Sequence, residues 1–174
     1  MADQLHQMTV SFSPQEDRLL LRFGTTSHIE YRLWLTRRLV TELWKGLVKA
    51  VENTPDVKVQ SEPRVRQAIL SMRHQEAVKG GDFSQKPDPV AQPHPLSEKP
   101  MLVVGIKSAP APQGKTALSF QVEGQKDIGL VLDDKIIHAL CHLIVTGVSN
   151  AKWGLKLTVA DPSVLVAASN GKVH

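Results

Sequence analysis

The sequence predicts an α+β fold of two β-β-β-α units with antiparallel sheets, plus one connector helix. The first observation is a change of hydrophobic period at Thr36. Apolar residues alternate up to Leu35, as in a half-buried strand, and from Thr36 they follow the i, i+3, i+4 spacing of one helix face. The second observation is that the same change of period returns 97 residues later, at Asp133.

Three strands are predicted before the first of these helices, over Met8–Phe12, Arg18–Phe23 and Ile29–Leu35. The turn sequences PQED and TTSH separate them, so they form a meander that leads into the helix. Thr36 is the expected N-cap, because its hydroxyl accepts a hydrogen bond from a free amide of the first turn. The apolar stripe of the helix comprises Leu39, Val40, Leu43, Trp44, Leu47, Val48 and Val51.

Pro55 ends this helix, because the residue before a proline disfavours helical geometry. The short segment Val57–Gln60 is predicted as a strand. The connector helix follows, with Ser61 as its N-cap and a proline in its first turn. It runs to about Val78, and Gly80-Gly81 ends it. Its predicted buried face comprises Val65, Ala68, Ile69 and Met72.

The second unit has predicted strands over Met101–Lys107, Thr116–Val122 and Asp127–Leu132, a helix over Asp133–Val148 and a last strand over Trp153–Val159. All seven stripe positions of the first helix have apolar counterparts here, namely Ile136, Ile137, Leu140, Cys141, Ile144, Val145 and Val148. These matches predict an internal duplication, although any two units of strands followed by a helix would share part of the pattern.

The predicted organisation has five parts: a first β-β-β-α(-β) unit over 1–60, the connector helix over 61–79, a linker over 80–100, a second β-β-β-α-β unit over 101–160 and a tail over 161–174. Asp82–Pro100 contains five prolines and, apart from Phe83, almost no large apolar residue. Such a segment buries too little surface to offset the entropy of ordering it, so an extended, flexible linker is expected.

The composition indicates a globular protein, with 41% hydrophobic and 22% charged residues among 174. No apolar run approaches the roughly 20 residues of a membrane span, and the first residues are too polar for a signal peptide. The single cysteine, Cys141, leaves no intramolecular disulfide. We therefore expect a cytoplasmic protein. The formal net charge of +4 is compatible with an acidic partner such as nucleic acid.

The sequence Gly114-Lys115-Thr116 matches the end of a phosphate-binding loop. The full motif requires a glycine where Ala109 stands, and a helix afterwards whose amides hold the phosphates. The following residues predict a strand instead, so no nucleotide-binding loop and no cofactor are predicted.

No metal site or catalytic group is predicted. His138 and His142 are spaced i, i+4 beside Cys141, but the cysteine belongs to the buried stripe, and partly exposed flanking histidines are the better interpretation. The acidic pairs Asp133-Asp134 and Glu16-Asp17 fit a helix start and a turn, and neither comes with a nucleophile or base. The sequence therefore predicts no enzyme.

Two candidate binding surfaces remain. The first is a sheet face on which Trp34 lies among arginines, and its residues are Arg22, Arg32, Trp34, Arg37 and Arg38. The favoured interpretation, however, is that the connector helix covers this face. The second surface is the outer side of the connector helix, with Arg64, Arg66, Arg73 and His74. A solvated face is the favoured interpretation of these residues, and a basic partner-binding surface is the alternative.

These surfaces predict a non-catalytic protein–protein interaction or assembly module of the bacterial cytoplasm, with a protein partner or self-association. The alternative is a module that binds single-stranded nucleic acid through a basic and aromatic sheet face, because a repeated meander and helix resembles the layout of sheet-and-helix proteins that bind single strands. Neither a membrane nor a small-molecule substrate is indicated.

Overall fold

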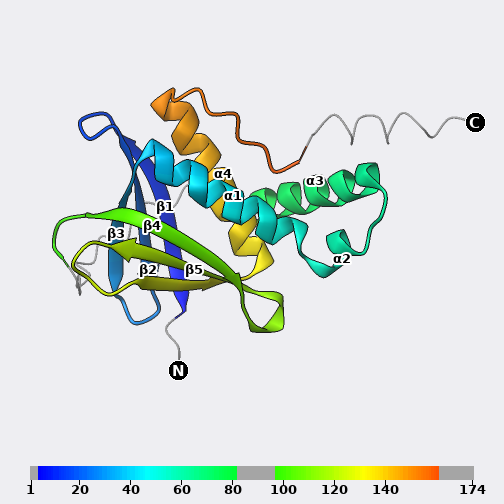
Figure 1. Cartoon of the computed structure of the whole chain (residues 1–174), viewed down its shortest axis with the longest axis horizontal. Coiled ribbons are helices and arrows are strands. Elements are labelled where there is room, and N and C mark those ends of the chain that lie inside the picture. The colour runs from blue at the N-terminus through cyan, green and yellow to red at the C-terminus, as the bar shows by residue number, and fades with distance from the viewer. Residues whose placement is uncertain (1–3, 82–96, 161–174) are drawn as a thin grey trace, which may run out of the picture.

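The computed structural model describes residues 4–81 and 97–160, which form one six-stranded sheet with helices on one side (Figure 1). The predicted α+β class is confirmed. The strands lie in sequence order and are β1 (Leu5–Ser13), β2 (Arg18–Thr25), β3 (Glu30–Leu35), β4 (Met101–Pro110), β5 (Thr116–Val122) and β6 (Ile128–Leu132). The helices are α1 (Arg37–Glu52), α2 (Pro55–Lys58), α3 (Pro63–Gly80) and α4 (Asp134–Ala151), and a 3₁₀ turn, η1 (Pro112–Gly114), joins β4 to β5.

Neighbouring strands pair antiparallel except at the centre of the sheet, where β3 and β4 run parallel. There Leu33 lies opposite Met101 and Trp34 opposite Leu102. The expectation of antiparallel sheets is therefore wrong at this junction, and the sheet is mixed. A parallel pair requires a long crossover connection, and the helices α1, α2 and α3 stand between β3 and β4 in the chain.

α1 and α4 each pack on strands of the other unit rather than across the strands of their own unit. α1 follows β3 but lies mainly on β4, where a Cβ added to Gly46 would approach Ser108 Oγ to 3.0 Å. α4 follows β6 but lies on β1 and β2, where a Cβ added to Gly147 would approach Val10 to 3.1 Å and Leu19 to 3.2 Å. The two helices also contact and cross each other (Figure 1). The sheet and both helices thus enclose one common core.

The core contains the alternating strand residues and the helix stripes that the sequence predicts to be buried. The hairpins of the two units have equivalent registers, because β2 pairs Leu21 with Leu33 of β3, and β5 pairs Leu118 with Leu130 of β6, 97 residues later in each strand. The fully buried side chains of the sheet include Leu19, Leu21, Phe23, Leu33, Leu35, Leu118, Phe120 and Leu132.

The N-caps at the two changes of hydrophobic period, Thr36 and Asp133, are confirmed. The Thr36 hydroxyl accepts a hydrogen bond from the amide of Leu39 at 3.3 Å, and the Asp133 carboxylate accepts one from the amide of Ile136 at 2.9 Å. Each cap therefore satisfies one of the free amides at its helix start. These positional equivalences do not by themselves establish a common origin, and the internal duplication stays a prediction.

Two predicted strands are wrong. Val57–Gln60 contributes instead to α2, because a proline in the first turn starts a helical segment that buries Val57. Trp153–Val159 pairs with no strand in the described sheet. Trp153 is nevertheless buried, and its indole Nε1 donates a hydrogen bond to Asp17 at 2.9 Å. The alternating pattern of this segment thus reflects packing on the core without strand pairing.

The connector helix α3 begins and packs differently from the prediction. Its N-cap residue is Glu62 rather than Ser61, without a side-chain cap, and the helix continues through Gly80. Val65 and Met72, expected to be buried, are exposed. The helix packs against α4 and α2 through a different side, on which the buried residues are Leu70, Ser71 and Ala77.

Some expectations concern residues outside the described ranges. The predicted linker over 80–100, including Phe83, lies largely between the two described segments, and the predicted tail over 161–174 lies after the second.

Candidate functional site

The sheet has an open face, which we define as its side opposite α1 and α4. Leu33 and Leu35 are fully buried on the helical side, so Trp34 between them points to the open face. Strand pairing places Trp34 between Leu20 of β2 and Leu102 of β4. α3 packs on α4 and α2, on the helical side, so the expectation that the connector helix covers Trp34 is wrong. Trp34 is half-buried on the open face. Leu20, Trp34 and Leu102 form an apolar row across three strands.

A basic row lies beside this apolar row. Arg22 and Arg32 are direct cross-strand partners, an arrangement of like charges that is unfavourable by itself. Arg22 Nε donates to Glu30 Oε1 at 2.6 Å, and Arg32 donates to the backbone carbonyl of Glu98. Arg32 Nε is buried and has no hydrogen-bond partner among the described residues. These hydrogen bonds fix both guanidinium groups at the open face and use only some of their N–H donors.

Further apolar side chains extend the open face toward β6. Leu102 is 38% exposed, Val104 is 43% exposed and Val131 is 59% exposed. Val131 alternates with the buried residues Leu130 and Leu132, which places it on the open face. A flat aromatic ring beside guanidinium groups is an arrangement that stacks unpaired bases and holds phosphates.

The predicted group of five residues is divided between two parts of the molecule. Arg22, Arg32 and Trp34 lie together on the open face, whereas Arg37 and Arg38 belong to the first turn of α1, in the helical layer. Both arginines of α1 are exposed, and Arg38 forms an i, i+4 ion pair with Glu42 at 2.7 Å. They contribute to the net charge near the sheet but not to the apolar and basic rows.

The predicted basic surface of the connector helix is also divided. Arg64 is exposed, and Arg66 is half-buried with its Nε unpaired among the described residues. Arg73 instead binds Asp134 of α4 at 2.8 Å and also pairs with Asp56 of α2. Burial opposes the charge of Arg73, but its bonds to Asp134 and Asp56 raise its pKa above the usual value. Arg73 therefore joins three helices and is not free to bind a partner.

His74 takes part in the same helix contact. Its Nδ1 lies 3.3 Å from Nδ1 of His138, so one ring must donate and the other accept. Burial, with a smaller effect of His138 and His142, lowers the pKa of His74 to about 4. Burial also lowers the pKa of His138, and Asp134 opposes that shift while Arg73 adds to it. The pair is thus held neutral between α3 and α4.

The structure also places the residues considered for metal binding. Among the described residues, no group of three or more ligating side chains is arranged to hold a metal ion. His138 faces His74 rather than sharing a site with His142 and Cys141. Burial raises the pKa of the Cys141 thiol to about 12, so it stays protonated and packs as an apolar side chain.

Two residues of the apolar row, Leu20 and Leu102, were missed from the sequence. Leu20 lies within a run of three leucines, where alternation alone does not show which side is exposed. Leu102 reaches Trp34 only through the parallel pairing of β3 and β4, between segments far apart in the chain. A predicted strand order would have been the only signal for that contact.

Comparison with known proteins identifies no relative. No family model matches the chain, and neither a curated protein nor a solved structure is significantly similar to it. Within the described segments, no helix combines the length and apolar character that a membrane span requires.

Proposed function

We propose that this protein is a non-catalytic binding module that holds single-stranded nucleic acid on the open face of its sheet. The observation that carries the proposal is the apolar row of Leu20, Trp34 and Leu102 directly beside the basic row of Arg22 and Arg32. Stacking of a base on an aromatic ring contributes roughly 1–3 kcal/mol, and it tolerates any sequence because every base has a flat face.

The chemistry of the two rows is complementary to a single strand. Trp34 offers a ring to the bases, and the neighbouring guanidinium groups offer charge and hydrogen-bond donors to the phosphates. The Nε of Arg22 is used by Glu30, so its remaining nitrogens would contact the phosphates. The net charge of +4 adds a long-range attraction for a polyanion.

The test is fluorescence anisotropy of a labelled single-stranded oligonucleotide of mixed sequence at low and moderate salt. We expect binding that weakens steeply with salt, and a loss of roughly tenfold for Trp34→Leu, which keeps the apolar character but removes the ring. Trp34→Phe is the matched control and should retain most of the affinity. Absence of binding at low salt would contradict the proposal.

A second candidate function is a protein interaction or assembly module that uses α2 and α3. The observation in its favour is that Val65 and Met72 are exposed at i, i+7 on one side of α3, and that Val59, the residue after α2, is also exposed. Exposed apolar side chains on one side of a helix are a feature of association surfaces. Light scattering is the test: an oligomer that becomes monomeric with Val65→Ser and Met72→Ser supports it, and a wild-type monomer argues against self-association.

The internal duplication is also proposed. It is supported by the equal register of the two hairpins, by the caps at Thr36 and Asp133, and by the reciprocal contacts of α1 with β4 and of α4 with β1. The two units of homologous chains, aligned separately, should be more similar to each other than to unrelated units with the same order of elements. The duplication would be refuted if the two units were no more similar to each other than each is to unrelated units.

A further inference from the structure

The two edges of the sheet are buried to different degrees. β6, at one edge, is a short strand in which three of the five residues are buried. β1, at the other edge, is the only strand of the described sheet without a buried residue. Its apolar side chains Leu5, Met8, Val10 and Phe12 pack against the core but are only partly buried. The edge at β1 therefore lacks cover that the edge at β6 has.

β1 also lacks the features that protect an edge strand. Edge strands in soluble proteins usually carry charged residues, prolines or bulges, which prevent them from pairing with another chain. The nine residues of β1 include no charged residue and no proline, and its one irregularity lies near the start, between Leu5 and Gln7. β2 is the only described strand that pairs with it. The rest of β1 is thus a regular edge to which an extended chain can add.

An apolar groove of about 280 Å³ follows this edge between β1 and α4. From β1, Met8 and Val10 line the groove, on the side of the sheet where their cross-strand partners in β2 are buried. From α4, the groove is lined by Ile136, Ala139 and Leu143, which are spaced i, i+3, i+7 on one side of the helix. All five side chains are half-buried, so each leaves apolar surface exposed.

The charge of the groove indicates what kind of molecule fits it. No Asp, Glu, Lys or Arg lines it in the part of the chain that the structure describes, although the formal net charge of the chain is +4. A nucleic acid would find no cation here for its phosphates. Two copies of this chain, in contrast, can meet at this surface without bringing like charges together. Depletion of charged residues is also characteristic of the centre of protein interfaces.

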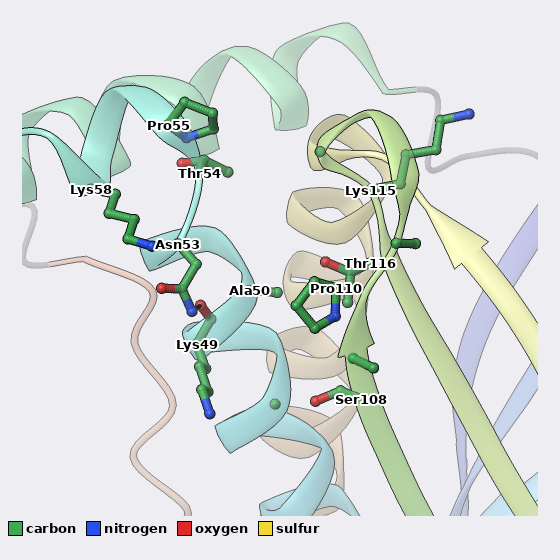
Figure 2. Close-up of a pocket in the computed structure, with 14 residues that line it drawn as sticks. Lys49, Ala50, Asn53, Thr54, Pro55, Lys58, Ser108, Pro110, Lys115 and Thr116 are labelled. Atoms are coloured by element: carbon green, nitrogen blue, oxygen red, sulfur yellow. Dashed lines mark hydrogen bonds between the residues drawn. The ribbon is translucent and has the colours of Figure 1, made fainter.

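A larger cleft of about 400 Å³ differs from the groove in this respect. It lies between the end of α1 and the β4–β5 hairpin, and its lining includes Lys49, Lys58 and Lys115 (Figure 2). Figure 2 shows Lys58 extending toward Asn53, whereas Lys115 points away from the gap. The ammonium groups therefore do not converge on one point, and two copies joined at this cleft would place like charges close together.

We propose that two copies of this chain associate through β1, which pairs antiparallel with β1 of the second copy around a twofold axis. Such a pair is closed, because each copy covers the unprotected edge of the other and the same surface is used twice. Pairing of β1 with β6 of another copy would instead leave an edge free at each end and continue into a fibre. The groove side of each α4 lies beside the seam and buries the apolar surface of the paired strands.

The proposed dimer surface is separate from the two surfaces considered above. The twofold axis is perpendicular to the sheet, so the helices of both copies stay on one side and both open faces lie on the other. Trp34→Leu should therefore leave the dimer intact. The exposed residues Val65 and Met72 belong to α3 and do not line the groove, so Val65→Ser with Met72→Ser should leave it intact as well.

The test is sedimentation equilibrium of the intact chain over a range of concentrations, together with amide hydrogen exchange measured by mass spectrometry. We expect a reversible dimer, and amide exchange in β1 that becomes slower as the concentration rises. Ala139→Glu places a carboxylate in the groove and should weaken the dimer roughly hundredfold, because the seam would bring two like charges together. The exchange measurement tests the same contact in the wild-type chain, without any substitution.

Ser149→Glu is the matched control, because it adds the same charge to α4 at an exposed position that does not line the groove. It should dimerise like the wild type, and circular dichroism should show that both variants are folded. A monomer at every concentration would overturn the proposal. If that monomer showed slow exchange in β1, another part of the same chain would cover the edge. A dimer that Ala139→Glu leaves unchanged, or that Ser149→Glu weakens equally, would also overturn it.

Discussion

The starts of α1 and α4 have the same cap geometry and opposite charges. Thr36 and Asp133 each accept a hydrogen bond from the amide three residues later. The next residues of α1 are Arg37 and Arg38, which are exposed, whereas α4 continues with Asp134, which binds Arg73 of the connector helix. Negative charge is favourable at a helix N-terminus and positive charge is not.

The difference follows from what packs against each helix start. α3 lies against α4, so Asp134 both complements the helix dipole and joins two helices through Arg73. Arg37 and Arg38 are exposed, and Arg38 has only a surface ion pair with Glu42. One helix start therefore stabilises the tertiary structure, while the other presents charge to the solvent.

The largest expected effect is the loss of the Asp134 contact. Asp134→Ala should lower the free energy of unfolding by about 2–3 kcal/mol, because it leaves the half-buried Arg73 with fewer partners. We expect less than the full cost of breaking a buried pair, because the two side chains are 28% and 29% exposed. Urea unfolding measures the change.

The matched control for that variant is the ion pair between Arg38 and Glu42 on α1. Arg38→Ala removes the exposed ion pair with Glu42 and should change the free energy of unfolding by less than about 0.5 kcal/mol. Equal losses in Asp134→Ala and Arg38→Ala would show that the two helix starts do not differ in the way proposed.

A second effect concerns pH. In the folded protein, burial lowers the pKa of His74 to about 4, whereas the ordinary pKa of a histidine side chain is 6.5. The unfolded state therefore binds more protons between these values, and stability should decrease as the pH falls from 6.5 to 4. The other ionisable side chains at this helix contact are His138, His142, Arg73 and Asp134.

We expect His74 to lower the free energy of unfolding by about 1–2 kcal/mol between pH 6.5 and pH 4. This is less than its full pKa shift implies, because His74 is only half-buried and solvent screens its charge. Unfolding free energies measured from pH 7 to pH 4 should fall less steeply in His74→Phe, which keeps a ring between α3 and α4. His28→Gln, in the loop between β2 and β3, is the control and should follow the wild type. An unchanged slope in His74→Phe would refute the assignment.

The sequence predicted the parts of the fold that depend on local period. Strand alternation and the helix stripe identified both hairpins and both long helices, and capping chemistry identified Thr36 and Asp133. The parallel junction of β3 with β4 and the exchange of α1 and α4 between units depend on contacts distant in the chain. A hydrophobic pattern shows that a face is buried, but not which element covers it.

The connector helix shows the same limit at the level of single residues. Its apolar pattern predicted burial of Met72, but the neighbouring Arg73 and His74 face α4 instead. The surface of α4 that α3 packs on is polar at Asp134 and His138. The residues of α3 that become buried against it are therefore polar too. Because the helix docks there, the face that bears Trp34 stays free of it, and this could not be predicted from the sequence.

A third prediction compares the two caps directly. Thr36→Ala and Asp133→Ala should each lower the free energy of unfolding by about 1 kcal/mol, because each leaves a helix amide without its side-chain acceptor. The loss should be slightly larger at Asp133, whose charge also complements the helix dipole. Urea midpoints at constant m-value measure both. A loss at only one cap would show that the two helix starts are not equivalent.

The smallest effect on stability is expected for the double variant Arg37→Asp with Arg38→Asp. Acids at this helix start remove an unfavourable interaction with the dipole, which is partly offset by the loss of the Glu42 ion pair, so we expect a gain of roughly 0.5 kcal/mol. The formal net charge falls by two for each substitution, from +4 to zero.

The same double variant separates long-range attraction from contact at the open face. Because these arginines lie in the helical layer, their reversal should weaken oligonucleotide binding at low salt through the field of the protein, and the effect should fade at moderate salt. The effect of Trp34→Leu should persist at both salt concentrations, because stacking does not depend on screening. Anisotropy titrations at two salt concentrations distinguish these outcomes. If the reversal leaves binding unaltered in a folded protein, the charge difference between the two helix starts has no part in binding.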